Sequence, residues 1–71
     1  MNLKDANNPV AGNVERLIDE KGLKRKAVAN RLGMSEGTFS RMLNGRAIIK
    51  PIHIQAMAAA LGVSPNELFE T

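Results

Sequence analysis

The stretch RLGMSEGTFSRMLNG, residues 31–45, decides the fold of this 71-residue chain. An apolar helical pattern ends at Gly33, and a second begins after Ser35, a residue type that caps helices well. Two short helices joined by Gly33-Met34-Ser35 cannot continue as one rod, because Gly33 favours the left-handed conformation and Ser35 restarts the helix at a steep angle. The stretch therefore predicts two short helices joined by a tight turn.

The second of these helices has two unlike sides. At about 100° per residue, Phe39, Met42 and Leu43 fall together, which predicts that this side faces the core. The opposite side is small and polar and is centred on Gly37 and Arg41. Glycine in a helix costs about 0.5–1 kcal/mol relative to alanine. We therefore interpret Gly37 as a clearance residue that lets the helix enter a groove roughly 12 Å wide; the alternative is that glycine is merely tolerated beside the cap.

Positive charge is concentrated in the middle third of the chain. The net charge is +3, but residues 21–50 carry +7 while residues 1–20 and 51–71 carry −2 each. This predicts an anionic partner, with a solvated basic surface as the alternative. The chain has no cysteine and one histidine, His53, which we interpret as a surface residue; we expect no metal. No apolar run approaches the roughly 20 residues of a membrane span, so we expect a cytoplasmic protein.

The rest of the chain adds further short helices and no strand. We expect a flexible segment over residues 1–8 and a single all-α domain over residues 9–71. The first helix of the pair covers about Lys24 to Leu32. Capping and breaking residues delimit the other helices: Asn8-Pro9 to Gly22, Pro51 to Gly62, and a short last one that Ser64 and Glu67 begin with a reciprocal capping box.

A known family shows the same arrangement. The segment LKRKAVANRLGMSEGTFSRMLNGR, residues 23–46, resembles the helix-turn-helix DNA-binding domains of the lambda-repressor/Cro-like (xenobiotic-response-element) group. AMAAALGVSPNELF, residues 56–69, is similar to the last two helices of that family. The resemblance covers about residues 10–69 and implies a compact five-helix fold. Lys24 departs from the family, which often has serine or threonine there, and Pro51 comes later than the family's proline.

The resemblance implies a recognition helix that enters the major groove and a set of residues that contact bases or phosphates. Its base-facing candidates are Ser35, Glu36, Gly37, Thr38, Ser40 and Arg41. The phosphate candidates are Arg25, Lys26, Asn44, Arg46 and Lys50. Arg41 suits guanine, whereas Glu36 either accepts a hydrogen bond from cytosine or simply sits at the positive end of the helix. Lys21 and Arg31 are interpreted as ordinary solvated charges.

These features predict a sequence-specific, double-stranded DNA-binding transcriptional regulator, a bacterial or phage repressor. One recognition helix reads few base pairs, so we expect a homodimer on a palindromic operator. The apolar candidates for the dimer contact are Ile48, Ile49, Ile52, Leu68 and Phe69. We expect no cofactor, small-molecule effector or membrane partner, and no enzymatic activity, because no catalytic constellation is evident. The alternative is a helix-turn-helix fold that binds protein, as an antitoxin- or antirepressor-like partner.

Overall fold

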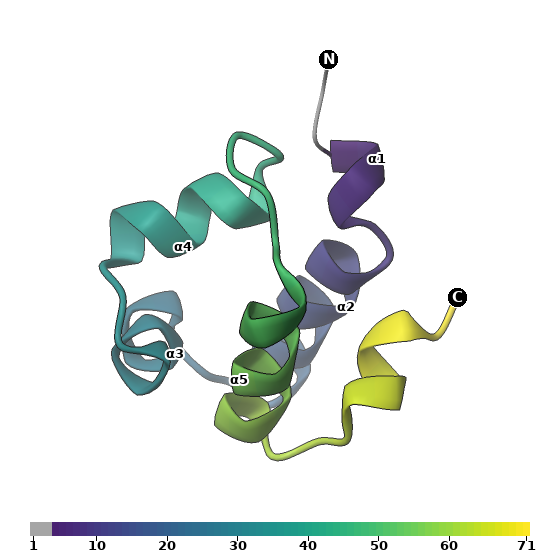
Figure 1. The fold of residues 1–71 in the computed structure, drawn as a ribbon. Helices are drawn as coiled ribbons and strands as arrows, with labels where there is room; N and C mark the ends of the chain where they lie inside the picture. Colours follow the sequence, from purple (N-terminus) through teal and green to yellow (C-terminus); the bar gives the residue numbers. More distant parts are fainter. Residues whose placement is uncertain (1–3) are drawn as a thin grey trace.

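The computed structural model describes residues 4–71, and all regular structure in that range is helical (Figure 1). This confirms the predicted all-α class and the helix-turn-helix fold. No helix in the described range is long and apolar enough to cross a membrane. The elements in chain order are α1 (Lys4–Asn7), α2 (Val10–Glu20), α3 (Arg25–Leu32), α4 (Glu36–Leu43), α5 (Pro51–Leu61) and the 3₁₀ helix η1 (Pro65–Phe69).

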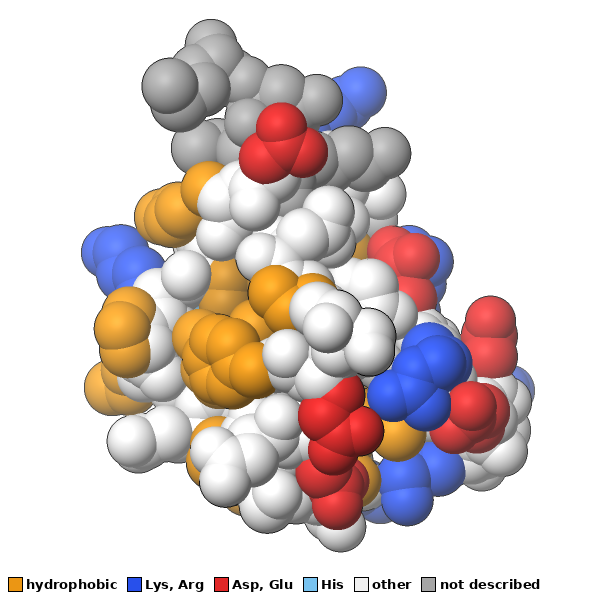
Figure 2. Space-filling view, turned by 90° about the vertical axis from the view of Figure 1, so that its right-hand side faces the viewer, with side chains coloured by type: hydrophobic (Ala, Val, Ile, Leu, Met, Phe, Trp, Pro, Cys, Tyr) orange, Lys and Arg blue, Asp and Glu red, His pale blue; other side chains and the backbone are white. Residues whose placement is uncertain are grey.

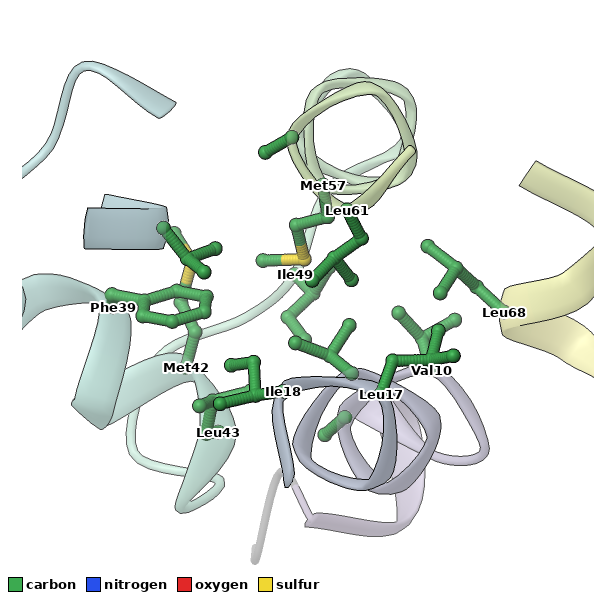
Figure 3. Packing of buried hydrophobic residues seen from close by; sticks show 14 of the residues in the cluster. Val10, Leu17, Ile18, Phe39, Met42, Leu43, Ile49, Met57, Leu61 and Leu68 are labelled. Carbon is green, nitrogen blue, oxygen red and sulfur yellow. The ribbon is translucent and has the colours of Figure 1, made fainter. Parts of the chain in front are cut away.

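The core lies where α2 and α5 pack against each other, with α3 and α4 on one side and η1 on the other (Figure 1). Figure 3 shows side chains of α2, α4, α5 and η1 meeting there, together with Ile49 of the loop before α5. Phe39, Met57 and Leu68 are fully buried. Burying a side chain of this size stabilises the fold by about 1.5–3 kcal/mol. The core therefore fixes α4 through Phe39, Met42 and Leu43, on the side predicted from their spacing.

The turn between α3 and α4 has the predicted form. Gly33 is left-handed, with φ 73°. Its N–H donates to the Asn30 carbonyl and the Met34 N–H donates to the Ala29 carbonyl, both at 3.1 Å. This is the Schellman pattern, which ends a helix and turns the chain away from its axis. Ser35 Oγ then accepts from the Thr38 N–H at 3.1 Å and begins α4.

The N-terminal segment departs from the expectation. Residues 4–7 form α1, and Asn7 is 2% exposed rather than part of a loose tail. Residues 1–3 of the expected flexible segment lie outside the described residues. The cap predicted from Asn8 is absent, because α2 begins at Val10 with Pro9 before it and no side-chain cap bond.

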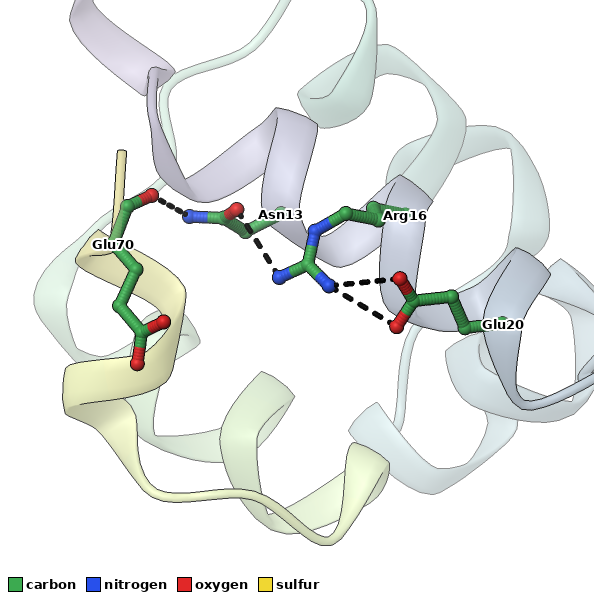
Figure 4. Close-up of polar contacts among 4 residues, drawn as sticks. All are labelled: Asn13, Arg16, Glu20 and Glu70. Atoms are coloured by element: carbon green, nitrogen blue, oxygen red, sulfur yellow. Dashed lines mark hydrogen bonds and ion pairs between the residues drawn. The ribbon is translucent and has the colours of Figure 1, made fainter.

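The C-terminal turn also differs in detail from the prediction. Ser64 makes no side-chain cap bond, so the capping box with Glu67 does not form; instead the Glu67 N–H donates to the Ser64 carbonyl at 3.1 Å. Asn13 holds this turn from α2 by donating from Nδ2 to the Leu68 and Glu70 carbonyls, each at 2.7 Å. Figure 4 shows Asn13 reaching Glu70 on one side and the exposed Arg16–Glu20 ion pair on the other.

Two of the five dimer candidates are corrected by the packing. Ile49 is 8% exposed and Leu68 is 0% exposed, because both side chains close the core of their own protomer. Neither offers an apolar surface to a second subunit. Ile48, Ile52 and Phe69 remain exposed.

Candidate nucleic-acid interface

One flank of α4 is open to solvent along its length. Glu36, Gly37, Thr38 and Arg41 are exposed, and Ser40 is half-buried. The flank is open because α4 buries its opposite side and because the Gly33 turn swings it away from α3. Figure 1 shows α4 at the edge of the molecule, on the side of α5 opposite η1. All of the base-facing candidates except Ser40 are thus exposed.

Nothing within the protomer explains the glycine at position 37. A Cβ atom built on Gly37 would meet only Ser35 Oγ, at 4.0 Å. Gly37 lies within α4 and is not among the four glycines with positive φ. Space and backbone conformation would both admit a larger residue, which would also favour the helix. Glycine at this position is therefore either required by a partner outside the isolated chain or merely tolerated at the start of the helix.

The polar groups of this flank fall into two sets. Ser35 and Thr38 are joined at the helix start, since Ser35 Oγ also donates to Thr38 Oγ1 at 3.0 Å. That bond and the cap bond occupy Ser35, which therefore serves α4 itself. Glu36 and Arg41, in contrast, form no ion pair among residues 5–71, whose side chains the structure describes, so their charged ends are available to a partner.

A second positive site lies at the start of α3. Lys24, Arg25 and Lys26 are all exposed there, no side chain caps the helix, and its first turn contains no acidic residue. Cations at the positive end of a helix are unfavourable, whereas an anion would be stabilised by the free N–H groups. Glu15 of α2 partly neutralises this cluster of cations, with its Oε1 3.6 Å from Arg25 Nη2. Arg25 is thus partly engaged, and Lys26 forms no ion pair within the described range.

The loop between α4 and α5 carries the remaining phosphate candidates. Asn44, Arg46 and Lys50 are exposed on it. Asn44 also donates weakly to Ser40 Oγ, at 3.4 Å. His53 is half-buried rather than a plain surface residue, and its Nδ1 accepts from the Lys50 N–H at 3.1 Å. This bond helps to fix the end of the loop at the start of α5.

Arg31 has a structural partner that the sequence did not reveal. Its Nη1 donates to the Ala60 carbonyl at 2.8 Å, near the C-terminus of α5. A cation there satisfies a terminal carbonyl and complements the negative end of the helix. Arg31 therefore joins α3 to α5, whereas a freely solvated charge was expected.

The far side of the molecule has a different character. Figure 2 shows the face around η1, where hydrophobic side chains gather on one half and acidic and basic side chains mingle on the other. Residues 51–71 contain no lysine or arginine. The phosphate candidates belong to the first turn of α3 and to the loop after α4, and none belongs to η1.

Comparisons with known proteins agree with this architecture. A family model described as a helix-turn-helix domain matches residues 10–70. The restriction-modification controller protein C.AhdI from Aeromonas hydrophila is similar in structure, with a TM-score of 0.78 and 25% identity over 84% of this chain and 91% of that one. The hypothetical transcription factor NHTF from Neisseria also has a TM-score of 0.78, with 30% identity over 86% of this chain and 70% of that one. No curated protein sequence matches the chain.

Proposed function

The chain belongs to the helix-turn-helix family of DNA-binding transcription regulators, and from that premise we propose that it represses transcription by occupying a short operator. In this proposal α4 enters the major groove, two subunits bind a palindromic site, and occupancy itself excludes the transcription machinery. The chain would then act on the nucleoid, in the cytoplasm.

The open space at Gly37 is the observation that carries the proposal. A helix without a side chain at this point can bring its backbone close to the base edges, which a bulky residue would prevent. Arg41, on the same flank and free of an ion pair, has the planar fork that matches O6 and N7 of guanine. Gly37 would let the backbone of α4 come close to the base pairs, and Arg41 would determine which base is preferred.

The cations around α4 would supply most of the affinity. Arg25 and Lys26 border the uncapped start of α3, and Arg46 and Lys50 project from the loop on the other side of α4. If about 4–6 phosphates are neutralised per subunit, log affinity should fall with log salt by about 0.9 for each of them. Phosphate contacts of this kind position α4 but carry no sequence information themselves.

Dimerisation would use the apolar residues that the core leaves exposed. Ile48 is 41% exposed, Ile52 is 71% exposed and Phe69 is 52% exposed. Ile52 and Phe69 come from α5 and η1, which pack against each other. For two copies of α4 to enter successive turns on one DNA face, a two-fold contact through this surface must hold them about 34 Å apart.

Selection of bound duplexes from a random pool tests the proposal. Wild-type protein should enrich a short palindrome, whose symmetry reports the subunit count. Arg41→Ala is the matched variant and should lose preference at one base step per half-site. If no sequence is enriched and no random duplex binds at low salt, DNA binding is refuted and the protein-binding alternative takes its place.

A further inference from the structure

Asn7 is the one buried polar side chain in the described chain, and all of its hydrogen bonds reach the end of α4 and the loop after it. Its Nδ2 donates to the Met42 carbonyl and to the Ala47 carbonyl, each at 2.8 Å. Its Oδ1 accepts from the Ile49 N–H at 3.0 Å. One side chain from α1 therefore satisfies three backbone groups that lie 35 to 42 residues further along the chain.

Two of these backbone groups are next in sequence to exposed cations of the loop. Arg46 directly precedes Ala47, and Lys50 directly follows Ile49. Within the loop, the Arg46 and Ala47 N–H groups share the Arg41 carbonyl, at 2.8 and 3.2 Å. Those two bonds hold the first half of the loop. The buried Ile49 side chain and the bond from the Lys50 N–H to His53 Nδ1 hold the second half to the core and to α5, and Asn7 ties it to α4.

We propose that Asn7 is a positioning residue for DNA binding. It holds the loop after α4 so that Arg46 and Lys50 lie beside α4, where they contact phosphates. The inference rests on the proposed function, because it needs these cations to face DNA. Without Asn7, the loop would lose its connection to α1, and its cations would have to be ordered at the moment of binding. That ordering costs free energy and weakens each contact.

The chain contains a matched control in Asn13. Its Nδ2 also donates to two backbone carbonyls, but it joins α2 to η1, which lies on the opposite side of α5 from α4 (Figure 1). Asn7→Ala and Asn13→Ala thus remove the same chemical group from two different places. A purely structural role predicts that both variants lose stability and leave the mode of DNA binding unchanged.

The test measures the affinity of each variant for the selected operator across a range of salt concentrations. For Asn7→Ala, loss of up to two phosphate contacts should flatten the slope of log affinity against log salt by as much as about 1.8 and lower affinity about tenfold or more at 0.1 M salt. Asn13→Ala should keep the wild-type slope. In the Arg46→Gln/Lys50→Gln background, Asn7→Ala should cause little further loss, since the contacts it positions are already gone.

Several results would overturn the inference. If Asn7→Ala keeps the wild-type slope, or if both asparagine variants change DNA binding alike, Asn7 only stabilises the fold. If Asn7→Ala does not fold, Asn7→Ser, which retains a small hydrogen-bonding group, is put through the same titration under the same criterion. A wild-type chain that binds no duplex would refute the proposed function and this inference with it, whereas normal wild-type binding with an unchanged variant slope would refute the inference alone.

Discussion

Replacement of Gly37 separates the needs of the fold from those of DNA binding. The structure offers open space at this position, with only Ser35 Oγ at 4.0 Å from an added Cβ. Gly37→Ala should therefore stabilise the isolated protein, because alanine is the better helix former. Gly37→Leu should also fold, but its side chain would stand between α4 and the floor of the major groove.

The expected magnitudes follow from this geometry. Gly37 lies in the first turn of α4, where the glycine penalty is near the low end of its range, so Gly37→Ala should gain about 0.5 kcal/mol. In a domain of this size such a gain raises Tm by about 2–4 °C. Gly37→Leu should lose at least the discrimination supplied by one bidentate base contact, about 1–3 kcal/mol, which is about 5- to 150-fold in affinity.

Thermal unfolding and operator binding measured on the same samples test both expectations. Gly12→Leu is a matched control, because Gly12 is exposed within α2 and an added Cβ would make only an ordinary contact, 3.6 Å from Asn8 Oδ1. The control should bind the operator as wild type does. If Gly37→Leu folds and binds the operator with unchanged affinity, the clearance interpretation is wrong. A lower Tm for Gly37→Ala would show that the helix itself requires glycine there.

Three further substitutions test separate parts of the account. Arg41→Ala should cost about 1–3 kcal/mol on the operator and relax selection at one base step; an equal loss on every duplex would identify a phosphate contact instead. Ser35→Ala removes the cap of α4 and should cost about 1 kcal/mol of unfolding free energy, checked by urea denaturation, with an unchanged midpoint contradicting the cap. Glu15→Gln frees Arg25 from an ion pair in which both side chains are exposed, so the free energy of unfolding should change by less than about 1 kcal/mol. The affinity for random duplex DNA should rise at low salt, because Arg25 is then free to contact phosphate. A lower affinity would mean that Glu15 orients Arg25 for phosphate.

The sequence predicts those parts of the structure whose causes are local. Gly33 and Ser35 act through bonds to groups within five residues of them, and the structure has both as predicted. The inward side of α4 is equally predictable, because the spacing of Phe39, Met42 and Leu43 fixes their direction once a helix forms.

The parts that the sequence did not reveal depend on distant segments. In the sequence, Asn7 is one of several polar residues near the N-terminus. Its role depends on the loop near Ile49, which lies beside it only in the folded chain. Leu68 was a candidate for a dimer contact because it is apolar. The packing of η1 against α2, held by Asn13, buries it. The role of Arg31 likewise depends on the C-terminal end of α5, whose Ala60 carbonyl accepts its hydrogen bond. No pattern within a single helix carries this information.

The most direct test of the central claim is to map the DNA-binding surface residue by residue, by following backbone amide NMR shifts as the selected operator is added. The account predicts the largest changes at residues 35–41, with further changes at the start of α3 and in the loop after α4. Changes concentrated on α5 and η1, with Gly37 and Arg41 unaffected, would contradict it.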